Sequence, residues 1–244
     1  MQKEIGIITA ITRYPVKSMA GEPVESIELG WQGLAGDRRL AFRRIEEKNG
    51  FPWLTASKLP ELILFKPHRV SEVATGTSPI LPTHVITPEG NILELFSEEL
   101  RCEISRRFKS DVELMHLKHG IFDEAPLSLI SHATINAIQQ NTDIRRFRAN
   151  IVIETIDNMP FIEDSWVGEN ITIGGDGAKM HVTLKDERCM MVNLDPETAQ
   201  VEPAIMKSVV KLNNNFAGVY GTVIQTGTIA VGQKIYMQSG MEKL

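Results

Sequence analysis

Short runs in which apolar and polar residues alternate dominate the chain, a period that is typical of strands with one buried face. In residues 38–45, for example, Leu40 and Phe42 alternate with Arg39 and Arg43. Such runs predict strands over residues 3–13, 24–29, 38–45, 51–55, 84–87, 91–95, 111–117, 150–155, 170–173, 180–185, 190–194, 219–225 and 229–237, with a further apolar run over 61–66. Many short strands with few helices favour β-barrels or sandwiches.

Turn signals separate several of these runs. Asn49-Gly50 predicts a hairpin that folds residues 51–55 back onto the preceding strand. Residues 88–90 predict a second hairpin, and the glycine-rich residues 174–177 a third, because they lie between two strands rather than before a helix. The Pro-, Ser-, Thr- and Gly-rich residues 68–83 are predicted to form a mobile loop.

Two segments carry a helical pattern instead. Ser97 can cap a helix in which Leu100, Ile104 and Phe108 recur every four residues. A second helix is expected over residues 131–140. Cys102, in the first helix, is expected to be partly buried packing.

Length and composition limit the class of protein. The 244 residues suggest one or two domains, and a boundary is expected near residues 118–122, dividing the chain into 1–120 and 121–244. A net charge of −5 gives no basic footprint for nucleic acid. The sequence shows no long apolar run and no signal peptide, so we expect a cytoplasmic protein that does not associate with membranes.

The two cysteines, Cys102 and Cys189, are too few for a disulfide framework, a four-cysteine zinc site or a cysteine-held iron–sulfur cluster. Cys189 is the candidate for chemistry, because it is expected at the junction of two strands with Lys185 and Arg188 nearby. Positive charge favours the thiolate, which attacks electrophiles or binds soft metals. The alternative is a small buried apolar residue.

Three basic clusters point to an anion. Lys17 and Ser18 follow the first strand, Arg38 opens the third, and Arg148 follows a short run of arginines before Asn150. Guanidinium forks, an ammonium and a hydroxyl together match a phosphate. Taken singly, each cluster could equally be solvated surface.

The order of several motifs resembles the MOSC family, named after the C-terminal domain of molybdenum cofactor sulfurase. These motifs are Y-P-V-K-S, G-D-R, R-F-R-A-N-I-V-I, E-D-S-W, E-R-C and D-P-E-T. The chain is most similar to the branch that contains the mitochondrial amidoxime-reducing component and its bacterial relatives. The resemblance implies a mainly β protein of two packed β-barrel-like domains, a MOSC N-terminal β-barrel domain over 1–120 and a MOSC domain over 121–244.

The same resemblance implies site residues in a cleft between the domains. Cys189 would be the protein ligand of molybdenum and the catalytic residue. Residues that contact the pterin or its phosphate would be Lys17, Ser18, Arg38, Asp123, Glu124, Arg148, Asn150 and Arg188. Glu124-Ala125 stands where several relatives have Thr-Ser, and a carboxylate beside an anionic cofactor is unfavourable unless it is protonated or turned away. Ala199 stands where the family often has Gly, which is expected to alter only a turn.

The leading hypothesis is therefore a molybdenum-cofactor (Mo-molybdopterin) oxidoreductase that reduces N-hydroxylated small molecules such as amidoximes, N-hydroxylated bases or hydroxylamines. Pyridoxal phosphate is not expected beside this cofactor. Electrons are expected from an external electron-donor protein, and the proton source is unassigned. The second hypothesis is a non-enzymatic cofactor carrier or sulfur-handling protein. The third is a metal-free cysteine enzyme, for which Cys189 has no well-placed base, since His181 is expected on the preceding strand.

Overall fold

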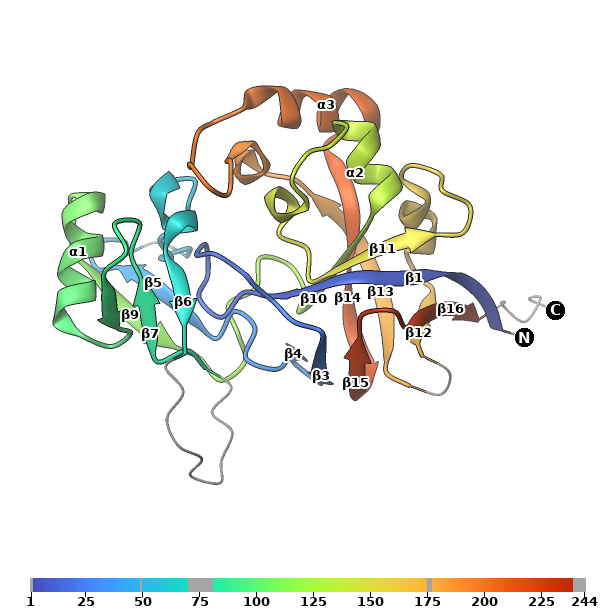
Figure 1. Cartoon of the computed structure of the whole chain (residues 1–244), viewed down its shortest axis with the longest axis horizontal. Helices are drawn as coiled ribbons and strands as arrows, with labels where there is room; N and C mark the ends of the chain where they lie inside the picture. Colours follow the sequence, from blue (N-terminus) through green and yellow to red (C-terminus); the bar gives the residue numbers. More distant parts are fainter. Residues whose placement is uncertain (1, 49, 70–80, 175–176, 239–244) are drawn as a thin grey trace.

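The computed structural model describes residues 2–48, 50–69, 81–174 and 177–238, and within them the chain is mainly β, which confirms the predicted fold class. Seven strands of this described part close into a barrel in the order β11-β10-β14-β13-β12-β16-β1, because β1 also pairs with β11 (Figure 1). The barrel strands are β1 (Gln2–Arg13), β10 (Leu127–Ser131), β11 (Ile151–Thr155), β12 (Asn170–Ile173), β13 (Lys179–Glu187), β14 (Phe216–Gln225) and β16 (Lys234–Gln238). Closure leaves these strands without open edges.

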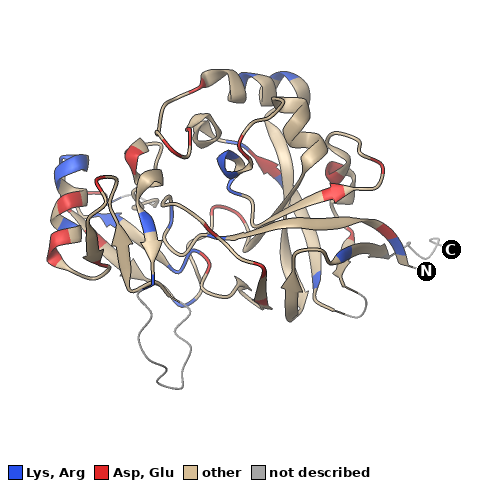
Figure 2. Cartoon of the chain, in the orientation of Figure 1, with Lys and Arg blue, Asp and Glu red and all other residues tan. Residues whose placement is uncertain are grey.

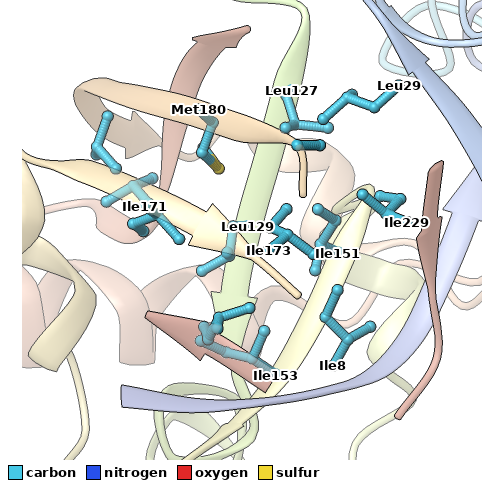
Figure 3. Close-up of a cluster of buried hydrophobic side chains, with 14 of the residues drawn as sticks. Ile8, Leu29, Leu127, Leu129, Ile151, Ile153, Ile171, Ile173, Met180 and Ile229 are labelled. Carbon is cyan, nitrogen blue, oxygen red and sulfur yellow. The ribbon is translucent and has the colours of Figure 1, made fainter. Parts of the chain in front are cut away.

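Aliphatic side chains fill the barrel. Pairs two residues apart on one strand, such as Ile151 with Ile153 and Ile171 with Ile173, point to the same interior, as the strand period requires (Figure 3). Three short strands, β3 (Ser26–Gly30), β4 (Gly33–Leu34) and β15 (Gly227–Ala230), form a separate sheet that contributes to the same core.

A smaller body lies beside the barrel, on the left of Figure 1. It contains β5 (Leu40–Arg44), η1 (Pro60–Leu64), β6 (Lys66–His68), β7 (His84–Ile86), β8 (Ile92–Glu94), α1 (Glu98–Phe108) and β9 (Val112–His116). Strands β5 and β9 pair with each other, and β6, β7 and β8 form a second sheet. Phe42, Phe65 and Leu100 belong to the core between these elements.

The strand pairing crosses the predicted division of the chain. Strand β1 lies in the first half, yet it closes the barrel by pairing with β11 and β16 of the second half. The end of β1 pairs with the short β2 (Glu22–Pro23). The division at residue 120 stays a prediction, and the barrel takes one strand, β1, from before it and six strands from after it.

The helices are partly as predicted. Ser97 caps α1 by accepting a hydrogen bond from the Leu100 amide at 3.2 Å, and Ser131 caps α2 (His132–Ile138) through the Thr134 amide at 3.1 Å. The prediction for Cys102 is wrong, because it is exposed. A step of two residues from Leu100 turns its side chain to the opposite face of the helix. Helix α3 (Pro203–Asn213) was not predicted at all.

Four strand predictions need correction. Residues 190–194 form the 3₁₀ helix η4 (Met190–Asn193), and most of 61–66 forms η1. Residues 51–55 make only an isolated bridge, between Trp53 and Arg43. The predicted strand 229–237 is two strands, β15 and β16, with different partners. Short apolar runs fit helix and strand alike, so the period does not separate them.

Two further 3₁₀ turns lie in the second half of the chain: η2 (Ile144–Phe147) and η3 (Ile162–Trp166). Trp166 of η3 is buried. Residues 70–80 of the predicted mobile loop, and residues 49, 175 and 176 of two predicted turns, lie outside the described residues. Among the helices of the described part, none is long and apolar enough to cross a membrane.

Candidate functional site

A cavity of about 340 Å³ lies where the barrel and the smaller body meet, a size typical of small-molecule pockets. Both bodies line it, and charged segments of both signs gather in this part of the molecule (Figure 2). The predicted site residues in its wall are Lys17, Ser18, Arg38, Asp123, Glu124, Arg148, Arg188 and Cys189. The remaining predicted residue, Asn150, lies behind Arg38. The fold therefore brings together residues that are far apart in the sequence.

Lys17 enters the cavity from the segment that follows β1. Its side chain is 4% exposed, and Nζ donates to Asp123 Oδ1 at 2.7 Å and to the Ile121 carbonyl at 3.2 Å. Burial lowers the pKa of Lys17, and the Asp123 carboxylate works in the opposite direction. Burial alone would raise the pKa of Asp123, but Lys17 outweighs it and holds that pKa below its usual range. The two residues form a charged pair at the cavity wall.

Arg38 is held from three sides. Its Nη1 donates to Asp37 Oδ2 at 2.6 Å and to Asn150 Oδ1 at 3.2 Å, and its Nη2 donates to the Arg148 carbonyl at 3.0 Å. Burial opposes the charge of Arg38, but Asp37 outweighs burial and the pKa of Arg38 is raised. Asn150 also accepts from the amide and hydroxyl of Ser128. In this geometry Asn150 orients the Arg38 fork from behind.

Among the described cations of the cavity wall, Arg148 is the one that forms no ion pair. Among the described residues its guanidinium makes no hydrogen bond and no ion pair, and it lies 4.3 Å from the centre of the Tyr14 ring. Arg38 contacts the same ring, at 4.9 Å. Burial, followed by the charge of Arg38, lowers the pKa of Arg148. An arginine in this state is suited to an anion that enters the cavity.

Three residues of the wall have left-handed backbone conformations. The φ angles are 66° at Ser18, 48° at Arg38 and 50° at Arg148. Such angles are uncommon outside glycine and concentrate at functional sites, where the surrounding structure enforces them. Here each angle occurs where the chain changes direction beside the cavity.

Cys189 is the second residue after the end of β13 and directly precedes η4, so it lies between a strand and a 3₁₀ helix rather than between two strands. Its thiol is exposed at the cavity. The preceding Arg188 is buried, donating from Nε to the Ala217 carbonyl at 2.7 Å and from Nη1 to the Phe147 carbonyl at 2.6 Å. Gly218 makes room for this guanidinium, because an added Cβ would lie 3.2 Å from Nη2.

Two wall residues with shifted pKa values were missed by the sequence analysis. Asp186 and Tyr220 line the cavity from β13 and β14. Burial raises the pKa of Asp186 to about 6, although Arg188 opposes the shift. Burial and the charge of Asp186 also raise the pKa of Tyr220. The only sequence signal for Asp186 is an acid three residues before Cys189, which does not reveal its burial.

Glu124 is exposed, in keeping with its place at the rim of the cavity. Glu163, from the E-D-S-W motif, is buried away from the cavity and accepts hydrogen bonds from the Ser131 amide at 3.1 Å and hydroxyl at 3.0 Å. It therefore supports the start of α2, which is a structural role. Ala199 has a φ of 57° and closes the turn at Asp195, a conformation that suits glycine.

A metal at Cys189 would need most of its ligands from elsewhere. Among the described residues, no group of three or more His, Cys, Asp or Glu side chains is placed to hold a metal ion. The cavity thus offers one thiol, that of Cys189, and one arginine without an ion pair among the described residues, Arg148. This donor set fits a metal that arrives bound to an anionic organic cofactor, and it does not fit a free metal ion.

A larger cavity, about 450 Å³, adjoins the first one and shares Arg146, Arg148 and Met191 with it. Its other walls include Ala10 and Ile63, and Cys189 is not part of it. Of these two cavities, size alone would favour the larger one, but the thiol and the lysine lie in the smaller one. We therefore assign the candidate site to the smaller cavity.

Comparison with known proteins gives two family matches. Residues 116–236 match the MOSC domain, and residues 5–83 match the MOSC N-terminal beta barrel domain. Among solved structures, the YUAD protein from Bacillus subtilis aligns over 99% of this chain and 100% of its own, with a TM-score of 0.52 and 12% identity. At that identity the likeness concerns the fold.

Two curated relatives cover the chain differently. Mitochondrial amidoxime reducing component 2 of Homo sapiens is 22% identical over 290 aligned positions, covering 96% of this chain and 84% of that protein. Molybdenum cofactor sulfurase of Caenorhabditis elegans is 28% identical over 130 positions, covering 51% of this chain but only 17% of that protein. With both domains matched in order, the chain belongs to the family that joins a MOSC N-terminal β-barrel domain to a MOSC domain.

Proposed function

We propose that this protein binds the molybdenum cofactor in the Cys189 cavity and uses it to reduce N-hydroxylated small molecules. The observation that carries the proposal is an exposed thiol in a cavity whose wall includes Arg148, a guanidinium with no anionic partner among the described residues. Similarity to the amidoxime reducing component over nearly the whole chain supports the same activity.

Different residues of the cavity would bind different parts of the cofactor. Lys17, Ser18, Arg38 and Arg148 would hold the phosphate and pterin, since they supply the ammonium, hydroxyl and guanidinium groups that such an anion requires. Cys189 would bind the metal as thiolate. When bound, the cofactor supplies two-electron redox chemistry, while the protein binds, orients and excludes water.

Electrons would come from a separate redox protein. Cys189 is assigned to the metal, and Cys102 is exposed on α1 of the other body. The two cysteines of this sequence therefore cannot also hold an iron–sulfur cluster. In the assays below, dithionite with a viologen dye replaces that protein.

The test of binding compares wild type, Cys189→Ala and Cys102→Ala, all purified from a bacterial host that makes the cofactor. Molybdenum is measured by mass spectrometry, and pterin by the fluorescence of its oxidised form. Wild type and Cys102→Ala should both carry molybdenum in stoichiometric amount, and Cys189→Ala should carry none. Wild-type protein free of molybdenum and pterin would refute the proposal.

The test of activity uses the same wild-type protein, reduced by dithionite and viologen, with benzamidoxime as substrate. Formation of benzamidine is expected, and Cys189→Ala should form none. Similarity to molybdenum cofactor sulfurase over part of the chain favours the second candidate, a carrier of the cofactor. Stoichiometric molybdenum without turnover of any N-hydroxylated substrate would overturn the reductase and support the carrier.

A further inference from the structure

Asp186 is a buried acid in the wall of the candidate site. It lies near the end of β13, its side chain is 3% exposed, and it lines the same cavity as Cys189. Its Oδ2 lies 3.0 Å from Arg188 Nη2, yet neither atom makes a hydrogen bond within the described part of the protein. Buried polar atoms in folded proteins nearly always have partners, so these two are exceptions at the site itself.

The charges around Asp186 are mixed. Arg188 and Arg38 favour its ionised form, whereas burial and the nearby acids Asp123 and Glu124 favour the protonated form. Tyr220 lines the cavity from the neighbouring strand. Burial dominates, and the resulting pKa of about 6 keeps about a tenth of Asp186 protonated at pH 7 and more at lower pH. Enzymes place proton-transfer groups in this range.

Other groups of the cavity are poorly suited to give up a proton. Arginines stay charged, and Asp123 is held ionised by Lys17. The pKa of Tyr220 is raised, which makes its hydroxyl a weaker acid. No histidine of the described residues is part of the cavity wall. Lys17 is buried and its pKa is lowered, but its Nζ donates to Asp123 and to the Ile121 carbonyl. Among the carboxylic acids that line the cavity, Asp186 is the buried one, and it can be protonated and can release its proton near neutral pH.

We propose that Asp186 is the proton donor of the reduction, an assignment that rests on the proposed function. Reduction of R–NH–OH to R–NH₂ and water consumes two electrons, supplied through the cofactor by the redox protein, and two protons. The N–O bond breaks, the Asp186 proton goes to the departing oxygen, and solvent supplies the second proton. The carboxylate left behind lies beside Arg188 and regains its proton from solvent.

The experiment uses Asp186→Asn, which keeps the side-chain volume and an oxygen toward Arg188 but cannot supply the proton. The control is Asp157→Asn, at an exposed position outside the cavity. We expect both variants to carry as much molybdenum as wild type. Turnover of benzamidoxime should fall about a hundredfold or more in Asp186→Asn and stay unchanged in the control. In wild type we expect kcat to fall as pH rises through the pKa of Asp186, and this fall should be absent in Asp186→Asn.

A second readout does not depend on activity. In protein purified without the cofactor, carboxyl-selective nuclear magnetic resonance should show one aspartate that titrates near pH 6, and Asp186→Asn should lack it. A molybdenum-replete Asp186→Asn with the wild-type kcat and pH profile overturns this assignment alone. Loss of molybdenum from Asp186→Asn also overturns it, in favour of a structural role. Wild type without molybdenum overturns the proposed function itself, and with it this assignment.

Discussion

Arg148, which we propose to bind an anion, lowers the stability of the free protein. Its guanidinium lies partly buried against Tyr14 and makes no ion pair with a described residue, so the carboxylates of Asp37 and Asp123 compensate only in part for lost hydration. Burial of a charge without a partner is unfavourable, and the lowered pKa of Arg148 reports that cost. In a site that is preorganised for an anion, the guanidinium is already dehydrated before the anion binds, and this lowers the stability of the free protein.

Replacement of Arg148 by Met should therefore separate stability from binding. The Met side chain can keep the packing on Tyr14, so the metal-free variant should be as stable as wild type or about 1 kcal/mol more stable. Retention of molybdenum should fall about tenfold or more, because an anion-binding group is lost. Urea unfolding of metal-free protein and metal analysis of loaded protein check the two parts. Arg145→Met is the control, since Arg145 is half-exposed and pairs with Asp143 and Glu197; loss of molybdenum there would contradict the assignment.

Asp186 gives a pH dependence of stability. Its pKa is about 6 in the folded protein and 3.8 as an ordinary aspartate, so the folded state binds more protons between these values. The contribution of Asp186 to the free energy of unfolding should therefore be greatest below about pH 4. It should fall as pH rises through 6 and stay low above it. For wild type relative to Asp186→Asn, the loss in unfolding free energy between pH 4 and pH 8 should be roughly 2–3 kcal/mol. Urea unfolding of metal-free protein at each pH measures it, and parallel curves for the two proteins would contradict it.

What the sequence reveals at the residue scale depends on where the signal lies. Cys189, Lys17 and Arg38 stand in local motifs whose residue types already suggest a thiolate and an anion site. Asp186 stands in none of these motifs. Tyr14 opens the same motif as Lys17, but its contact with the arginines comes from partners on other elements. Tyr14 contacts Arg148, more than a hundred positions away in the chain. Such contacts are a property of the tertiary structure and leave no local pattern.

At the scale of elements, those that carry their own signals were predictable. Helix α1 has a capping serine and an apolar row within its own residues, and β1 has a long alternating run. Helix α3 has no side-chain cap of its own. Its Met206 amide instead donates to Asn193 Oδ1 of η4, at 2.9 Å. A helix whose cap comes from a distant segment gives a weak starting signal in sequence, which is why α3 was missed.

The hydrogen bond from the Met206 amide to Asn193 connects α3 to the segment that contains Cys189. The Asn193 carbonyl also accepts a hydrogen bond from Arg146 Nη1 at 3.1 Å. Asn193, the last residue of η4, is therefore held through both its side chain and its backbone. Asn193→Ala should lower the unfolding free energy by about 1 kcal/mol, as loss of a cap does, and should also reduce molybdenum retention. Ser97→Ala removes a cap of the same kind from α1, and it should cost a similar amount without affecting molybdenum. Equal molybdenum content in both variants would contradict the link between η4 and the site.

At the scale of the whole molecule, the smaller body is an insertion into the barrel protein. The chain leaves the barrel region at Arg38 and returns at Ile121, and the Ile121 amide donates to the Arg38 carbonyl at 2.7 Å. The intervening residues make their own sheets and core. The barrel, in contrast, depends on β1, which supplies Ile5, Ile8 and Ile11 to its interior.

Two truncated proteins test this organisation. Residues 120–244 alone lack β1, so β11 and β16 become open edges and the interior loses three isoleucines. This fragment should be insoluble or unfold without cooperativity. Deletion of residues 40–117, with a short Gly-Ser linker joining Arg39 to Lys118, keeps all seven barrel strands and should unfold cooperatively in circular dichroism. Its molybdenum retention should be reduced, because Phe51, Thr55 and Ser57 of the cavity wall are removed. A folded 120–244 fragment that binds the cofactor with full affinity would show instead that the second half is sufficient, and that β1 is dispensable for both barrel and site.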